Sequence, residues 1–138
     1  MSKKIAVDQQ TKQAMIQLGE LIAECRGKCG LRKIALPSGI QASQLQYIEQ
    51  GILAPTAEVY PKLLKELKPN DAQRNEMDQL YMTIRKTPPP DVCELLINNP
   101  NLIAVLRAME DAKLSKKEMN SVLSSIAQMK IKGDTDNG

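Results

Sequence analysis

The three cysteines are the first residues to consider for chemistry, because the chain contains no histidine. Cys25 and Cys29 are four residues apart, so on a helix they share a face and have a spacing suited to two metal ligands. A structural zinc site usually takes four such ligands, and only Cys93 remains to join them. We therefore expect three free thiols in a reducing compartment, with no metal and no other cofactor.

Residues suited to catalysis are also scarce in the sequence. General acid–base catalysis uses histidine most often, and the chain has none. The sequence contains no glycine-rich phosphate-binding loop and no cluster of metal ligands. Its carboxylates lie at helical surface spacings rather than as a pair. These absences argue against an enzyme.

The stretch 34–51 has spacings that fit two short helices joined by a tight turn. Two helices that cross steeply need a small residue where their backbones approach, and Ala35 meets that need. Four residues later the turn requires a positive φ, which Gly39 adopts at little cost. The inward face of the second helix then carries Ile40, Leu45 and Ile48. Its outward face carries hydrogen-bonding side chains, namely Gln41, Ser43, Gln44, Gln46 and Tyr47.

Helical periodicity runs along the chain and predicts an all-α fold. A first helix, closed by Gly30, has an inward stripe of Leu18, Leu21, Ile22 and Cys25. Short helices over about 32–36 and 42–50 follow. Thr56 can cap a fourth helix that ends near Leu67, with a kink or a late start at Pro61. A fifth helix opens at Asn70 or Asp71, with Met77, Leu80, Tyr81 and Ile84 inward.

The run of prolines at 88–90 predicts a stiff hinge after the fifth helix. We therefore divide the chain into a domain over 1–86, a hinge over 87–90, a helical extension over 91–131 and a flexible tail over 132–138. The extension has three predicted helices, over about 91–97, about 101–113, and from the capping box formed by Ser115 and Glu118 onward. Its aliphatic stripe is either an intramolecular core or a dimer seam: Leu102, Ile103, Leu106, Met109, Met119, Val122, Leu123 and Ile126.

These spacings resemble the helix-turn-helix of the Cro and lambda-repressor class of transcriptional regulators, also called the xenobiotic-response-element family. The resemblance covers about residues 18–67. It rests on Leu18-Gly19-Glu20, Arg26 before Gly30-Leu31, Ala35 before Gly39, Ile48-Glu49-Gln50-Gly51, and Pro55. It implies a five-helix DNA-binding unit of the lambda-repressor kind, followed by about three further helices.

The resemblance implies that the outward face of the helix over 42–50 contacts DNA bases in the major groove. The expected base-reading residues are Gln41, Ala42, Ser43, Gln44, Gln46 and Tyr47. The expected phosphate contacts are Lys28, Arg32, Lys33 and Lys62. The expected structural residues are Arg26 and Glu49 as an internal ion pair, Ala35 and Gly39 at the turn, and Gly51 after the base-reading helix.

The distribution of charge leaves two functions open. The formal net charge is +3, with 13 Lys or Arg against 9 Asp or Glu in residues 1–86, and 6 against 7 in residues 87–138. A basic N-terminal half suits an anionic partner. However, no Lys or Arg lies between Lys33 and Lys62, and phosphate contacts supply most non-specific DNA affinity. Ile52 and Leu53 also place two apolar side chains in a loop that normally faces DNA.

We expect a sequence-specific DNA-binding transcriptional regulator, a repressor that acts as a homodimer on a pseudo-palindromic operator in double-stranded DNA. The homodimer is expected to be held mainly by residues after Pro90. The alternative is a protein-interaction module derived from the same fold, such as an antitoxin, anti-repressor or adaptor with a protein partner. No segment approaches the roughly 20 apolar residues that span a bilayer, and no secretory signal is visible, so we expect a cytoplasmic protein without membrane contact.

Overall fold

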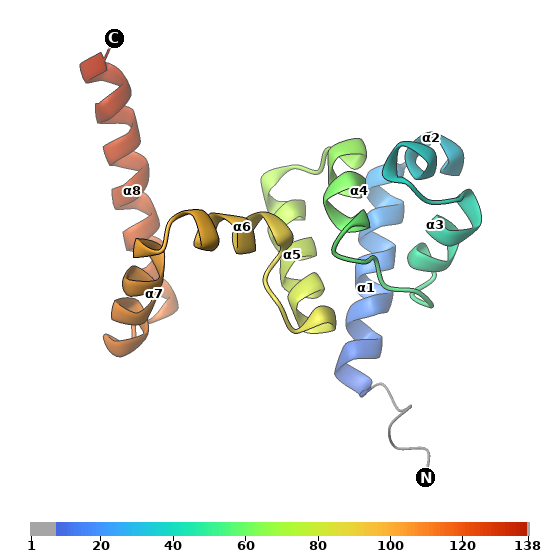
Figure 1. The fold of residues 1–138 in the computed structure, drawn as a ribbon, viewed down its shortest axis with the longest axis horizontal. Helices are drawn as coiled ribbons and strands as arrows, with labels where there is room; N and C mark the ends of the chain where they lie inside the picture. Colours follow the sequence, from blue (N-terminus) through green and yellow to red (C-terminus); the bar gives the residue numbers. More distant parts are fainter. Residues whose placement is uncertain (1–7, 138) are drawn as a thin grey trace. The chain divides into compact units, whose positions relative to one another are not determined.

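The computed structural model describes the backbone of residues 8–137 and the side chains of residues 8–130. Within this range it has eight α-helices, one 3₁₀ turn and no strand, which confirms the predicted all-α class (Figure 1). Two compact units divide the chain, one over residues 1–95 and the other over residues 96–138.

The first unit holds the helices that precede the proline run. They are α1 (Gln9–Arg26), α2 (Leu31–Ala35), the 3₁₀ turn η1 (Leu36–Ser38), α3 (Ala42–Glu49), α4 (Val59–Leu67) and α5 (Asp71–Arg85). The helix α6 (Pro90–Asn98) contains the division between the units. The second unit continues with α7 (Asn101–Asp111) and α8 (Lys116–Asn137).

Polar caps set the starts of three helices in the first unit. Asp8 accepts a hydrogen bond from the Thr11 N–H at 2.7 Å before α1. Asn70 accepts one from the Gln73 N–H at 2.8 Å, as predicted for the start of α5. Thr56 Oγ1 accepts from the Val59 N–H at 3.1 Å, and α4 begins there. The late start of α4 is therefore confirmed, since it places Pro61 in the first turn, where a missing N–H costs no helical hydrogen bond.

The predicted end of the first helix is wrong. Gly27, with φ of 56°, closes α1 by donating its N–H to the Ala23 carbonyl at 3.0 Å. Gly30 instead precedes α2 with φ of −66°, a value open to any residue. Both glycines suit a helix end, and the chain uses the first because it must turn before α2 begins.

The backbone of α8 continues to Asn137, through residues assigned above to a flexible tail. Polar residues lower helix propensity by only a few tenths of a kcal/mol each, and Gly133 by about 1 kcal/mol relative to alanine. Without a proline, these penalties do not end a helix that has already begun.

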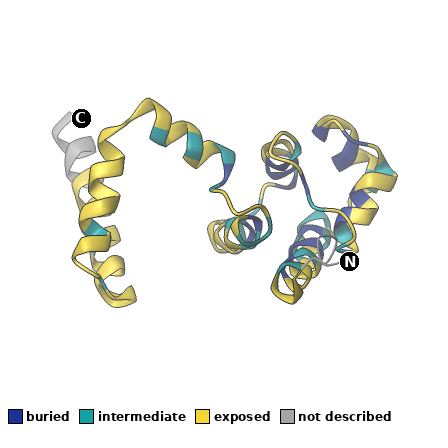
Figure 2. Cartoon of the chain, turned by 60° about the horizontal axis from the view of Figure 1, so that its bottom comes forward, coloured by how far each residue is buried: buried dark blue, intermediate teal, exposed yellow. Residues whose placement is uncertain are grey.

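The first unit has one aliphatic core with two stacked tyrosines. The buried face of α1 contributes Leu18 and Ile22, while α5 contributes Met77 and Tyr81, which confirms the predicted stripes. Figure 2 shows buried residues in dark blue on the helices of the first unit. The rings of Tyr60 and Tyr81 stack with centroids 4.3 Å apart. Burial of each such large side chain contributes about 1.5–3 kcal/mol to folding, so this core is the main source of stability in the first unit.

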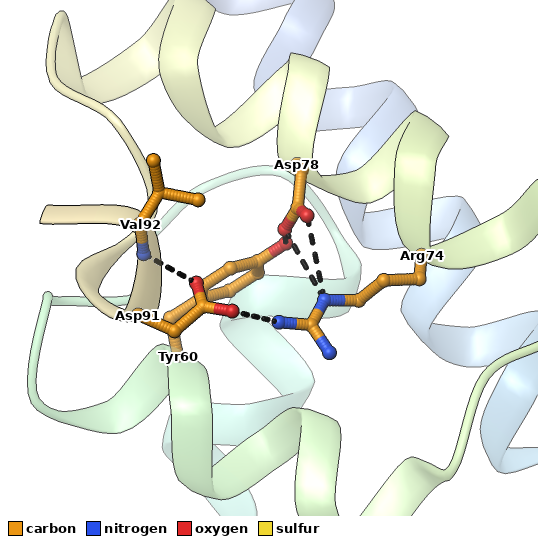
Figure 3. A network of polar contacts seen from close by, with 5 residues as sticks. All are labelled: Tyr60, Arg74, Asp78, Asp91 and Val92. Carbon is orange, nitrogen blue, oxygen red and sulfur yellow. Dashed lines mark hydrogen bonds and ion pairs between the residues drawn. The ribbon is translucent and has the colours of Figure 1, made fainter. Parts of the chain in front are cut away.

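A polar network ties the start of α6 to α4 and α5 (Figure 3). Arg74 donates to Asp91 at 2.9 Å and pairs with Asp78 at 3.4 Å, and the Tyr60 hydroxyl donates to Asp78 at 2.7 Å. Asp91, at the start of α6, is thus joined to α5, and the two units divide further along α6, between Leu95 and Leu96.

The second unit has a different character from the first. Among its described side chains, through Lys130, none is buried. The stripe residues Leu102, Ile103, Leu106, Met119, Leu123 and Ile126 are exposed, and Met109 and Val122 are half-buried. Among the described side chains of this unit, the two stripes therefore form no buried core. None of the helices in the described range is long and apolar enough to cross a membrane.

Candidate nucleic-acid interface

The helix α3 has one buried face and one exposed face, as its sequence predicts. Leu45 and Ile48 are buried against α1 and the rest of the core, and Ile40 is buried just before the helix. The opposite face, called here the polar face of α3, consists of Gln41, Ser43, Gln44, Gln46 and Tyr47, all exposed. Ala42 is half-buried at its edge. Of the expected base-reading residues, five therefore project to solvent from the same eight-residue helix and its cap.

The turn before α3 has the predicted chemistry. Gly39 has φ of 82°, a left-handed value that costs other residues free energy. Ala35 is fully buried, and its carbonyl accepts from the Ile40 N–H at 3.1 Å. Ser38, which the sequence analysis passed over, is also fully buried and donates its hydroxyl to the Ile34 carbonyl at 2.7 Å. This hydrogen bond satisfies the buried hydroxyl group inside the turn. A serine is usually exposed to solvent, so its residue type alone does not predict this burial.

One residue of the polar face also caps its own helix. The Gln41 N–H donates to Gln44 Oε1 at 2.8 Å. This bond satisfies one of the backbone donors that a helix start leaves without an intrahelical acceptor. Gln44 is therefore committed to the start of α3, while Ser43, Gln46 and Tyr47 are left to contact a partner.

Two glycines bring the backbone of α1 against the end of α3. A Cβ on Gly19 would lie 2.5 Å from the Ile48 carbonyl oxygen and would also overlap the Glu49 carbonyl. A Cβ on Gly51, whose φ is 77°, would lie 2.8 Å from Ile16 Cα. These positions admit only a hydrogen in place of a side chain. Gly51 was expected to be structural, whereas Gly19 was noted only as part of the family resemblance.

The predicted ion pair between Arg26 and Glu49 is confirmed. The guanidinium donates to both carboxylate oxygens, at 2.6 and 2.9 Å, and the side chains are only 20% and 10% exposed. The Glu49 hydrogen bond also raises the pKa of Arg26, which therefore stays charged. Arg26 further donates to the Cys29 carbonyl at 2.6 Å. The pair fastens the C-terminal end of α3 to the C-terminal end of α1.

A second arginine, whose role the sequence did not predict, holds the loop that follows α3. Arg85, the last residue of α5, donates to the carbonyls of Pro55 and Ala54 at 3.0 and 3.1 Å. The partners are main-chain carbonyls 30 and 31 residues away. Carbonyl partners carry no side-chain signature, so no spacing in the sequence could reveal this contact.

Comparisons with known proteins found no match. No protein-family model, curated protein or solved structure matches the chain.

The expected phosphate-contacting residues lie in the turn after α1, in α2 and in α4. Arg32 lines a depression of about 400 Å³ together with Leu36, Gln41, Ala42 and Ser43, so its charge lies beside the start of α3. Lys62 Nζ lies 3.7 Å from the point where a Cβ on Gly39 would be, beside the turn, and 3.9 Å from Glu58. Lys28 and Lys33 are exposed, in the turn after α1 and in α2 respectively.

The loop after α3 carries apolar side chains on its surface. The N–H groups of Ile52 and Leu53 both donate to the Tyr47 carbonyl, at 2.9 and 3.3 Å, which turns the loop back over the end of α3. Their side chains are nevertheless 64% and 41% exposed. This exposed apolar pair adjoins the polar face and is suited to a less polar contact than a phosphate backbone.

The cysteines lie in α1, in the turn after it and in α6. All three are free thiols, and burial raises the pKa of the Cys25 thiol, which keeps it protonated. In the described part of the chain, no three His, Cys, Asp or Glu residues are grouped so that they could hold a metal ion.

Proposed function

We propose that the protein is a sequence-specific DNA-binding transcriptional regulator, a cytoplasmic repressor without enzymatic activity. The observation that carries the proposal is the polar face of α3. Its exposed Ser43, Gln46 and Tyr47 stand on a helix whose other side is buried and whose end is fixed by Gly19 and by the Arg26–Glu49 pair. A helix supported from behind in this way fits the major groove of B-DNA, with its N-terminal end toward the base edges.

The side chains of this face suit particular bases. A glutamine amide can accept from adenine N6 and donate to adenine N7, and the methyl group of Ala42 can pack on a thymine methyl. Arg32 lies beside Ala42 and Ser43 and would contact a phosphate, which positions the helix without reading sequence. The preferred site should therefore contain A·T pairs where α3 docks.

We also propose that the α2–α3 pair is a helix-turn-helix of the Cro and lambda-repressor class, carried by a five-helix unit. Because no Lys or Arg lies between Lys33 and Lys62, one such unit makes few phosphate contacts. A homodimer on a pseudo-palindromic operator offsets this shortage, since two half-sites are bound at once.

Selection of bound sequences from a random duplex pool tests the proposal. The full-length chain should enrich two A·T-containing half-sites related by two-fold symmetry, and its affinity for them should fall steeply as salt rises. A chain with Ser43→Ala and Tyr47→Ala should enrich nothing while it keeps the wild-type melting temperature. A wild-type chain that enriches no sequence contradicts the proposal.

A second candidate function is a protein-interaction module such as an antitoxin, anti-repressor or adaptor. The exposed Ile52 and Leu53, together with the cation-free stretch between Lys33 and Lys62, favour it. A complex built on these two side chains should survive high salt and be lost in Ile52→Ser with Leu53→Ser. DNA binding should show the opposite salt response.

A further inference from the structure

A short turn with defined local contacts joins the helices α7 and α8, and the two helices with this turn are called here the hairpin. Lys113 takes φ of 52° between them. The predicted capping box then opens α8: the Ser115 N–H donates to Glu118 Oε1 at 2.8 Å, and the Glu118 N–H donates to Ser115 Oγ at 3.1 Å. The turn and the start of α8 therefore need no partner to form.

The apolar residues of this hairpin are spaced as in a helical bundle. On α8 they follow intervals of three, four and three residues, through Met119, Val122, Ile126 and Met129. On α7 they follow intervals of four and three, through Leu102, Leu106 and Met109. Alternating intervals of three and four keep apolar side chains on one seam of a packed helix.

This seam is open to solvent in the single chain. Its large apolar side chains and their neighbours are between 37% and 70% exposed: Leu102, Ile103, Val105, Leu106, Met119, Leu123, Ile126 and Met129. The second unit spans only residues 96–138, close to the length below which a chain usually needs oligomerisation, a metal or disulfides to be stable. A two-helix hairpin cannot bury both of its own stripes.

The size and charge of the seam fit a second copy of the same chain. Eight large apolar residues, each more than a third exposed, form a patch of the order of the area that each partner buries in a stable dimer, about 800 Å². Residues 96–138 carry six Lys or Arg and five Asp or Glu, so two copies repel each other little. A strongly charged partner would find no complementary surface here.

We propose that the α7–α8 hairpins of two copies pack together as a symmetric four-helix bundle, with these stripes as its core. The bundle would be the interface of the homodimer described above, and for that role it rests on the proposed function. Its formation depends only on the hairpin, because none of the stripe residues lies in the first unit.

Light scattering of the full-length chain at tens of micromolar tests the proposal. The wild type should have twice the mass of one chain. Ile126→Glu places a charge in the seam and should raise the dimer dissociation constant by more than roughly 100-fold. Ser124→Glu makes the same charge change two residues away, on the opposite face of α8, and should stay dimeric. Ile126→Leu keeps the apolar volume and should also stay dimeric.

The variant Ile126→Glu could lose the dimer only because its hairpin unfolds. Hydrogen exchange of the wild-type chain tests the interface without a substitution. In the wild type, dilution below the dissociation constant should speed exchange in α7 and α8 and leave α1–α5 unchanged. A wild-type monomer at tens of micromolar overturns the proposal, because the seam is then covered by the chain itself or by a different partner. A dimer that tolerates both Leu106→Glu and Ile126→Glu overturns it too, since the interface then lies elsewhere.

Failure of the bundle can be distinguished from failure of the proposed DNA-binding function. Ser43→Ala with Tyr47→Ala should remain dimeric. A dimer that selects no DNA refutes the DNA-binding function and leaves the bundle intact. A monomer that selects half-sites refutes the bundle and the homodimer, and leaves base recognition by α3 intact.

Discussion

Arg26 and Glu49 join helix ends that are 23 residues apart in sequence. Their bidentate geometry is favourable for an arginine–carboxylate pair, and limited exposure weakens the screening by solvent. Both charges have lost much of their hydration. Removing one of them would leave the other poorly hydrated and without a partner, and this cost to folding exceeds the net gain from the attraction itself.

Arg26→Ala should therefore destabilise the first unit by about 2–4 kcal/mol, because Glu49 is left half-buried without its partner. DNA binding should fall only through this loss of folded protein. Arg32→Ala, which removes an exposed arginine nearby, is the control for stability. Thermal melting is the measurement, and a melting temperature that stays within about 1 °C of wild type would show that the pair is only a surface contact.

Ser43 and Tyr47 should determine sequence preference if the proposed function is correct. Either residue changed to alanine should weaken binding to the preferred site by roughly 1–3 kcal/mol and binding to random DNA little. Arg32→Ala should weaken both and reduce the salt slope by about one. Fluorescence titrations at several salt concentrations measure these terms. Unchanged specific binding in both alanine variants would give the interaction-module function priority.

Tyr60 should make the first unit sensitive to alkali. Burial and its hydrogen bond to Asp78 raise the pKa of this phenol far above its usual value near 10. Since the folded pKa is the higher one, this contribution to stability is complete below about pH 10 and is lost as pH rises toward the folded pKa.

Thermal melting from pH 8 to about 11 should show that loss, and Tyr60→Phe should reduce the slope. The phenylalanine variant also loses the bond to Asp78, so its stability at pH 8 is the baseline for the comparison. Tyr47→Phe, at an exposed position, is the control. Equal slopes in wild type and Tyr60→Phe would mean that this phenol does not cause the alkaline loss.

At the scale of elements, α3 depends on the helix behind it as much as on its own sequence. The carbonyls of Ile48 and Glu49 approach the position where Gly19 lacks a side chain. This contact lets the middle of α1 and the C-terminal end of α3 meet backbone to backbone, which sets how closely α3 packs against α1.

Gly19→Ala should consequently destabilise the protein, by about 1–3 kcal/mol, although alanine normally stabilises a helix relative to glycine. The added Cβ must push α3 away from α1. Gln17→Ala, two residues earlier on the exposed side of α1, should be neutral or slightly stabilising. Melting temperatures and amide chemical shifts of α3 measure the two effects, and a Gly19→Ala protein more stable than wild type would contradict the close contact.

Local pattern was sufficient to predict the helices, the buried stripes of α1, α3 and α5, the turn at Ala35 and Gly39, and the capping box of Ser115 and Glu118. Each depends on residues within one or two helical turns of each other. The choice of Gly27 over Gly30 was not predictable, since both fit a helix end and the path to α2 decides between them. The contacts of Arg85 and of Arg74 with Asp91 link distant segments, and their partners have no periodic spacing.

On the scale of the whole molecule, the two units differ in how they gain stability. The first has a closed core of aliphatic residues and tyrosines, whereas the described part of the second has no buried residue. A unit of the first kind can fold by itself, whereas the second would gain its core from the bundle proposed above.

Heating should therefore give two transitions in a calorimeter. The one from residues 1–95 should keep its midpoint as protein concentration changes, because its core lies within one chain. The one from residues 96–138 should move to higher temperature as concentration rises, since a dimer is stabilised by mass action. Ser124→Glu, on the opposite face of α8, should preserve this concentration dependence, and Ile126→Glu should abolish it. A single transition independent of concentration would contradict the two-unit description.

The polar face of α3 can accept amino-acid substitutions during evolution more readily than the buried face of the same helix. Ser43, Gln46 and Tyr47 are exposed, and the cap of the helix is made by Gln44 instead. Most substitutions at such surface positions change folding free energy by less than about 0.5 kcal/mol. Substitutions at these three neighbouring positions can therefore change the surface of α3 with little change in folding free energy. A library randomised at the three positions would consist largely of folded proteins. Gln44 marks the limit of that freedom, because its exchange alters the start of the helix as well as its surface.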